Sequence, residues 1–329
     1  YFHSKKLPGF EETGTFDVTQ WYAMGVPAEM QFWVFWAFFL GFAIKVPMFP
    51  FHTWLADAHV EAPTAASVIL AGILLKMGTY GFLRFAIPFF PDVALHPTVV
   101  TVVVTLAVIG IVYGALVAMV QPDFKKLVAY SSISHLGFVM LGIWALTVQS
   151  VEGAIIIMIS HGISTGALFF LSGMLYERTH TREIAAYGGI ARVVPMLAVI
   201  LSVVSLSSIG LPGTNGFIGE FLVLIGSWGV YPWATAIATT GVIFAAMYLL
   251  WALQRLIYNK LDKPENERLT DLTGRELAVL VPLIACIFWI GLYPAPFLRR
   301  IEASAQALVE QVRGPEQPAE QAQVAEVVQ

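Results

Sequence analysis

The sequence predicts an all-α polytopic membrane protein with about eight transmembrane helices, two of them broken. Of its 329 residues, 57% are hydrophobic and 12% are charged, against about 25% charged in a typical soluble domain. The mean hydropathy is +0.74. The net charge of −4 is too small to indicate a nucleic-acid partner. The single cysteine, Cys286, excludes an intramolecular disulfide and a thiolate-rich metal site.

The apolar runs of the chain are long enough to cross a hydrocarbon core of about 30 Å. In chain order the predicted spans are 30–55, 64–88, 97–121, 125–147, 152–176, 193–228, 233–257 and 276–295. The first and the sixth contain prolines, in KVPMFP and GLPGTNG. Because proline lacks an N–H and clashes with the preceding turn, each of these spans is predicted to break into two half-helices. We therefore expect an extramembrane segment over 1–27, a transmembrane domain over 28–295 and a C-terminal tail over 296–329.

The basic residues predict an orientation. Lysine and arginine gather in the loops after the third, fifth and seventh spans, around 121–126, 177–192 and 255–275. The loops at 148–151 and 229–232 carry none. Since cytoplasmic loops are enriched in basic residues, the first group of loops is predicted to face the cytoplasm.

The C-terminal tail has a different pattern. Ile301, Ala305, Leu308 and Val312 recur at helical spacing, with charged residues between them. This pattern predicts an amphipathic helix lying along the membrane surface or along a partner subunit. The polar run after Gly314 is predicted to be disordered or weakly helical.

Five ionisable residues lie inside predicted spans. A lysine or glutamate in mid-membrane costs about 2.5–3.5 kcal/mol on insertion scales, so such residues are functional candidates. The five are Lys45, Lys76, His135, His161 and Glu220. Lys45 precedes the first break, Glu220 follows the second, and Lys76 is the one charge in an apolar run.

Serines flank the two histidines, and we expect them to supply hydrogen bonds and room for water. These serines are Ser131, Ser132, Ser134, Ser160 and Ser164. An imidazole takes up and releases a proton near neutral pH, which favours a relay. Structural alternatives stay open: Lys45 could extend to the membrane surface from a helix end. Either histidine could be an ordinary interior residue, and Glu220 could be the partner of a neighbouring helix.

A metal site is not predicted. His52, Asp57 and His59 could resemble metal ligands, but helix capping and loop hydrogen bonds explain them more simply. The sequence contains no GxGxxG, no P-loop and no CxxCH motif, so no cofactor site is predicted either.

Broken helices and buried charges together suggest proton movement through a midplane line of lysine, histidine and glutamate. Helix breaks open the backbone around a site and let water approach, as they do in transporters. Moving a charge against the membrane potential costs about 2.3 kcal/mol per 100 mV. Because nothing in this chain supplies that energy, a driving partner is expected.

Long motifs resemble the antiporter-like membrane subunits of respiratory complex I, of the ND4/NuoM type. They are KVPMFPFHTWLADAHVEAPTAASVILAGILLKMGTYGFLR, DFKKLVAYSSISHLGFVMLGI, HGISTGALFFLSGMLYERTHTR and GLPGTNGFIGEFLVLIGSW. The resemblance implies an inverted pair of five-helix repeats, each with one broken helix, of which the second is complete here and the first partial. Members of the family have about fourteen spans, so the resemblance also implies that this chain is N-terminally truncated.

The resemblance implies a role for each candidate. Lys45 would be the lysine of the first broken helix and Lys76 the connecting lysine of the next span. His135 and His161 would be histidines of the polar axis, and Glu220 the acidic residue of the second broken helix. The implied function is proton translocation within NADH:quinone oxidoreductase, with no redox chemistry in this chain itself.

The same resemblance implies the surroundings of the protein. FMN, iron–sulfur clusters and quinone are expected in other subunits, and ND2-like and ND5-like subunits and the lipid bilayer are expected as neighbours. The expected location is the bacterial inner membrane, with the mitochondrial inner membrane as the alternative. Three other readings stay open: a subunit of a Mrp-type cation/proton antiporter, a membrane-bound hydrogenase subunit, or a structural membrane-arm component without its own proton path.

Overall fold

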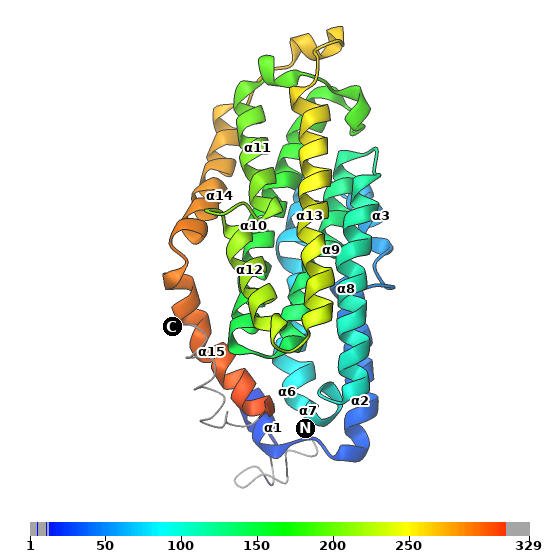
Figure 1. The fold of residues 1–329 in the computed structure, drawn as a ribbon, viewed down its shortest axis with the longest axis vertical. Coiled ribbons are helices and arrows are strands. Elements are labelled where there is room, and N and C mark those ends of the chain that lie inside the picture. Colours follow the sequence, from blue (N-terminus) through cyan, green and yellow to red (C-terminus); the bar gives the residue numbers. More distant parts are fainter. Residues whose placement is uncertain (1–4, 6–10, 12, 314–329) are drawn as a thin grey trace.

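Helices and short connections make up the part of the chain that the computed structural model describes, residues 5, 11 and 13–313 (Figure 1). The α-helices are α1 (Val18–Met24), α2 (Ala28–Lys45), α3 (Trp54–Glu61), α4 (Thr64–Ile69), α5 (Lys76–Gly81), α6 (Ile87–Phe89), α7 (Pro91–Ala94), α8 (Pro97–Met119), α9 (Phe124–Ala145), α10 (Val148–Thr179), α11 (Pro195–Ile209), α12 (Asn215–Trp228), α13 (Pro232–Leu253), α14 (Gly274–Leu292) and α15 (Ala295–Arg313). π-helical turns are η2 (Leu70–Leu74), η3 (Phe82–Ala86) and η6 (Gln254–Tyr258), and 3₁₀ turns are η4 (Ile184–Ala186), η5 (Ile190–Arg192) and η7 (Pro264–Arg268).

Six helical stretches within the described residues are long and apolar enough to cross a membrane. They are Thr64–Phe89, Pro97–Met119, Phe124–Ala145, Val148–Thr179, Pro232–Tyr258 and Gly274–Leu292. They correspond to six of the eight predicted spans, and the other two are the spans predicted to be broken. The predicted all-α polytopic fold is confirmed.

Both predicted breaks are present. The first span ends as α2 at Lys45 and resumes as α3 at Trp54. The sixth ends as α11 at Ile209 and resumes as α12 at Asn215. Gly210, directly after α11, has a φ of 83°. Only glycine adopts this left-handed conformation without a steric cost, so Gly210 ends α11 and turns the chain.

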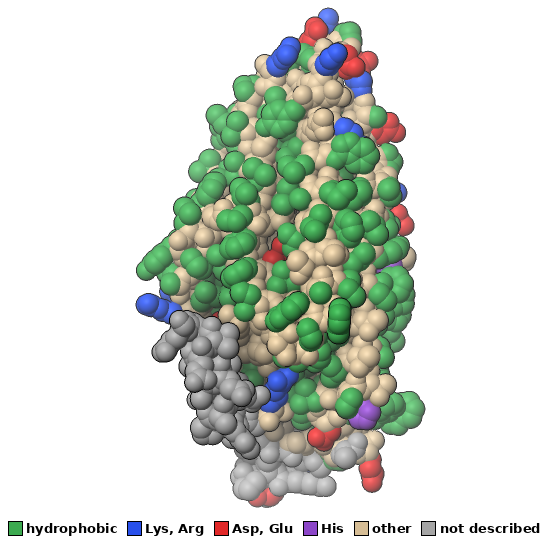
Figure 2. Space-filling model, in the orientation of Figure 1, with side chains coloured by type: hydrophobic (Ala, Val, Ile, Leu, Met, Phe, Trp, Pro, Cys, Tyr) green, Lys and Arg blue, Asp and Glu red, His purple; other side chains and the backbone are tan. Residues whose placement is uncertain are grey.

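Helix α9 lies at the centre of the bundle. Nearly all of its residues are buried, and α3, α8, α10 and α12 pack around it. A helix that is buried on every side has no polar face to present to water. On the outside, large apolar side chains such as Ile73, Trp233 and Leu292 are exposed. Figure 2 shows hydrophobic side chains over the middle of one face and charged ones gathered toward the two ends, as a membrane protein requires.

A bidentate ion pair joins the end of α10 to the start of α14. The guanidinium of Arg178 donates to both carboxylate oxygens of Glu276, at 2.7 and 2.8 Å, and also to the carbonyls of Thr270 and Asp271. Glu276 completes a capping box with Thr273 at the first turn of α14. Paired hydrogen bonds of this kind fix orientation as well as distance, so this end of the bundle is held firmly.

Helix α15 occupies the place where the apolar spacing of the tail predicts a helix. Its residues Ala305 and Val309 are buried, while Ile301, Leu308 and Val312 pack against the core. The apolar face of α15 therefore covers the side of this chain's own bundle, where it contacts α10 (Figure 1). The predicted disordered run after Gly314 lies outside the described residues.

Candidate functional site

Lys76 follows a π-helical turn in the middle of the second span. Its ammonium donates to the carbonyl of Ala71 in that turn and to Nδ1 of His161, with 2.6 Å between Nζ and Nδ1. The side chain is buried, at 7% exposure. π-helical turns often mark functional sites, because the wider turn alters the helix hydrogen bonding. Lys76 thus has two acceptors, which a buried ammonium needs in order not to be strongly destabilising.

A close backbone contact brings Lys76 and His161 together. A Cβ atom placed on Gly162 of α10 would lie 2.7 Å from the carbonyl oxygen of Gly72 in η2. Small residues allow helices in membranes to approach this closely. The pairing of Lys76 with His161 therefore depends on glycine at position 162, directly after His161.

Replacing Gly162 by alanine is expected to destabilise the protein by about 1–3 kcal/mol, as overpacking in a tight interior does. The added methyl group must separate α10 from η2. Gly166→Ala is the matched control, because its Cβ would lie 3.8 Å from Val68, an ordinary contact. The measurement is the midpoint of thermal unfolding in detergent, and equal midpoints for the two variants would contradict the expectation.

His135 and Glu220 form the second pair. Nδ1 of His135, on α9, lies 3.1 Å from Oε1 of Glu220, on α12, and both residues are 6% exposed. A Cβ atom on Gly210 would lie 2.8 Å from Oε2 of Glu220. Gly210, in the break before α12, therefore packs directly against this carboxylate. A residue with a side chain at position 210 would collide with the carboxylate.

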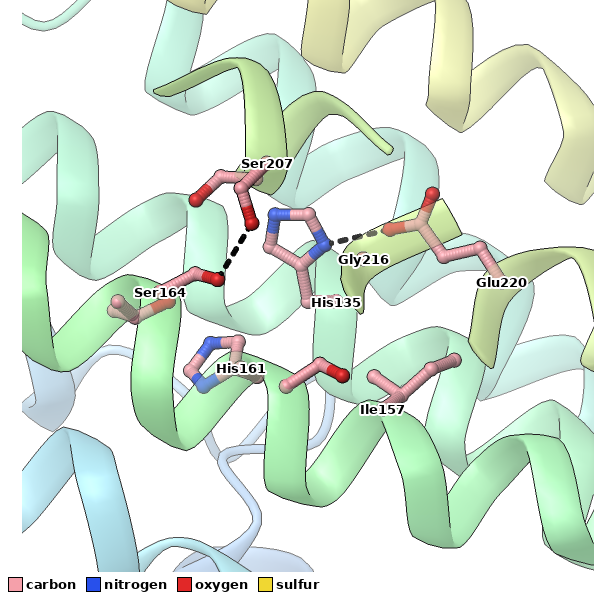
Figure 3. A pocket seen from close by; sticks show the side chains of 10 residues that line it. His135, Ile157, His161, Ser164, Ser207, Gly216 and Glu220 are labelled. Carbon is pink, nitrogen blue, oxygen red and sulfur yellow. Dashed lines mark hydrogen bonds and ion pairs between the residues drawn. The ribbon is translucent and has the colours of Figure 1, made fainter. Parts of the chain in front are cut away.

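The two pairs meet at a shared cavity (Figure 3). The rings of His135 and His161 are 5.6 Å apart between centroids. Both histidines and Glu220 line a cavity of about 20 Å³, together with Ser160, Ser164 and Ser207. This volume holds about one water molecule. The order Lys76, His161, His135, Glu220 thus forms one row across α5, α10, α9 and α12, which we call the polar row.

The serines that flank His135 are not its partners, and that expectation is wrong. The hydroxyls of Ser131 and Ser132 donate to the carbonyl of Val128, and Ser134 donates to Ile111. A serine inside a helix commonly returns its hydroxyl to a carbonyl one turn earlier. The imidazoles are instead paired with the ammonium and the carboxylate of the polar row.

Asn215 is a buried polar residue that sequence reasoning missed. It begins α12, and its Oδ1 accepts hydrogen bonds from the hydroxyls of Ser164 and Ser207. Its Nδ2 donates to the carbonyl of Ser160, whose hydroxyl donates to the carbonyl of Asn215. These bonds fasten the second break to α10. An asparagine directly after LPGT, in an otherwise apolar span, was the signal that could have indicated it.

Lys45 is not brought into contact with the polar row. It is the last residue of α2 and is half-buried. Within the part of the chain that the structure describes, no hydrogen bond or ion pair involves its side chain. Four of the five candidates therefore meet in space, and the fifth remains at the first break.

The explanation of His59 by capping or loop hydrogen bonds is wrong. Neither ring nitrogen has a hydrogen-bond partner among the described residues, and the imidazole stacks on Phe169 with 4.3 Å between ring centroids. No group of three or more His, Cys, Asp or Glu side chains that could hold a metal occurs in the described ranges.

Two broken spans around a buried row of ionisable side chains define a polytopic membrane protein of the antiporter-like class. The chain belongs to the family described as "NADH:quinone oxidoreductase/Mrp antiporter, TM", which matches residues 9–245. It is an integral membrane protein, and its relatives indicate an inner membrane.

Similar proteins carry consistent names. The chain is 50% identical over 277 residues to NADH-quinone oxidoreductase subunit M of Rhodobacter capsulatus, covering 84% of this chain and 54% of the relative. It is 44% identical over 299 residues to NADH-ubiquinone oxidoreductase chain 4 of Chondrus crispus, covering 91% and 60%. The chain therefore spans little more than half the length of these relatives.

Solved structures show the same fold. A chain of respiratory complex I from Thermus thermophilus with bound NADH is 37% identical, with a TM-score of 0.85 over 91% of this chain and 62% of that one. A chain of the Mrp complex from Dietzia sp. is 20% identical, with a TM-score of 0.78 over 93% and 65%. The second likeness concerns the fold alone.

Proposed function

We propose that this chain belongs to a proton-translocating membrane-arm subunit of NADH:quinone oxidoreductase, in which the polar row relays protons. The observation that carries the proposal is the sequence of contacts from Lys76 through His161 and His135 to Glu220. It contains two hydrogen-bonded pairs and a water-sized cavity between them. The names of the relatives support the same conclusion.

Each step of the relay transfers one proton and leaves the heavy atoms in place. The ammonium of Lys76 gives a proton to Nδ1 of His161 across 2.6 Å. A water in the cavity carries a proton between His161 and His135, and His135 exchanges a proton with the carboxylate of Glu220. Because these groups are close, a change of charge on one alters the proton affinity of the next. The row can therefore couple charge and proton movement.

The driving energy comes from other parts of the complex in this proposal. FMN, iron–sulfur clusters and quinone belong to other subunits, and ND2-like and ND5-like subunits are the proposed neighbours in the membrane. Lys45 remains a predicted relay residue at the first break, where it is half-buried at the end of α2.

The Mrp-type antiporter is the second candidate, since the fold is shared with that complex. The relatives at 50% and 44% identity, both named as oxidoreductase subunits, favour the first candidate.

Affinity purification from solubilised membranes separates the two candidates. The tagged protein is expected to copurify subunits that oxidise NADH and reduce quinone, and NADH:quinone activity of the eluate is the measurement. Copurification of small antiporter subunits, with no NADH oxidation in the eluate, would contradict the proposal and favour the antiporter.

A further inference from the structure

His59 is a buried titratable side chain that the polar row does not use. It is fully buried in α3, and neither of its ring nitrogens is hydrogen-bonded to the described part of the chain. A buried polar group without a partner costs about 1–3 kcal/mol. Such groups are rare in folded proteins, and each requires a reason.

A polar pocket lies at the end of α3, next to His59. Its volume is about 220 Å³, and its lining includes Glu61, Thr64, Lys125, Ser172 and Arg182. This volume has room for several water molecules. We call it the α3 pocket.

The two cations of the α3 pocket are held by the last turn of α3. Lys125 donates to the carbonyl of Ala62, and Arg182 donates to the carbonyl of Val60, each at 2.7 Å. Cations are favourable at a helix C-terminus, where carbonyl groups carry partial negative charge. The pocket lies at the end of the bundle where the predicted cytoplasmic loops gather.

One face of α10 leads from the polar row to the α3 pocket. His161, Thr165, Phe169 and Gly173 recur every four residues and therefore lie along the same side of the helix. Thr165 lines the cavity of the polar row, and Gly173 lines the α3 pocket. His59 stacks on Phe169, between the two.

Other titratable side chains lie on both sides of His59. His59 is close enough to Lys125 on the pocket side, and to His161 on the other side, for their charges to interact. Ser67 of α4 donates its hydroxyl to the carbonyl of His59 and anchors the backbone there. His161 and Phe169 are about two turns apart on α10, or ~12 Å, so water must complete the path between the two imidazoles.

We propose that His59 relays protons between the α3 pocket and the Lys76–His161 pair, and that the pocket is the water entrance of the path. This inference rests on the proposed function. A proton from pocket water binds one ring nitrogen of His59, and the other ring nitrogen releases a proton to water beside Thr165, which passes a proton to His161. No covalent bond between heavy atoms changes, and each water returns to its neutral state.

His59→Phe tests the relay, because phenylalanine keeps the ring that stacks on Phe169 but cannot carry a proton. The readout is the number of protons moved per NADH oxidised by the complete membrane complex in sealed vesicles. We expect at least a fivefold loss, with normal assembly and a thermal stability that does not fall, because the substitution also removes two unpartnered ring nitrogens. His52→Phe is the matched control, since His52 is also buried and stacks on an aromatic ring, that of Phe49. Normal proton movement in His59→Phe, or an equal loss in both variants, would overturn the proposal.

Cysteine accessibility tests the entrance independently. In a Cys286→Ser background, Ser172→Cys places a thiol on the α3 pocket, and Ala167→Cys places one in the buried core of the same helix. A small, charged, membrane-impermeant methanethiosulfonate added on the side of the basic loops is expected to modify only the first. Absence of modification at position 172 would overturn the assignment of the entrance.

The two proposals fail in different ways. If Lys76 and Glu220 variants stop proton movement while His59→Phe does not, only the relay through His59 is wrong. If proton movement survives replacement of Lys76 and Glu220, the proposed function itself is wrong.

Discussion

Lys76→Ala is expected to lower the number of protons moved per NADH oxidised at least roughly tenfold; loss of a positioned acid or base typically costs about 100-fold or more in rate. The substitution removes the hydrogen-bond donor to His161. The polar row then has no ionisable side chain from the second span. The carbonyl of Ala71 loses its partner as well. The measurement is NADH-driven acidification of sealed inverted membrane vesicles at matched amounts of assembled complex.

Two further lysine variants distinguish a relay from a structural charge. Lys76→Arg keeps the positive charge but cannot release a proton, so it is expected to behave like Lys76→Ala. Lys126→Ala is the control, because Lys126 pairs at 3.9 Å with the exposed Asp57 at the surface and is expected to have no effect. Full proton movement in Lys76→Arg would show that only the charge matters and would contradict the relay.

Glu220→Gln is expected to cause a loss of similar size. Glutamine keeps the shape of the side chain and an oxygen that can accept from His135, but it cannot take up a proton. Packing against Gly210 is retained, so the protein is expected to assemble normally. Proton movement per NADH is again the readout.

Glu267→Gln is the control for this change, since it removes an exposed carboxylate in η7, far along the chain from the polar row. In a serial path the double variant of Lys76 and Glu220 is expected to lose no more than the worse single variant. Losses that multiply in the double variant would indicate two independent paths, and unchanged proton movement in Glu220→Gln would remove Glu220 from the relay.

Much of the fold could be predicted because the information is local. Crossing a hydrocarbon core requires a long apolar run, and such runs are read directly from the sequence. The two breaks were predictable for a similar reason, since Pro47 and Pro212 each disturb the turn in which they occur. The free-energy cost of placing a charge in the membrane interior identified Lys76 and Glu220 as candidates, because a charge in an apolar run requires a compensating partner.

Which residues compensate one another was not predictable in this way. The serines next to His135 were the nearest polar groups in the sequence, yet their hydroxyls bond to backbone carbonyls. His59 looked like a capping residue and is instead buried against Phe169. The neighbours of the two imidazoles come from other helices: Glu220 of α12 lies beside His135, and Phe169 of α10 lies beside His59.

The sequence by itself determined where the chain crosses the membrane, where two spans break and which buried charges need partners. Only the tertiary structure decided the partners: Lys76 with His161, and His135 with Glu220, each pair 85 residues apart in the chain. The close approach of Gly72 and Gly162 sets the first pair, and the turn at Gly210 sets the second. A buried charge specifies that a partner must exist, but the crossing of the helices specifies which side chain comes within hydrogen-bonding distance.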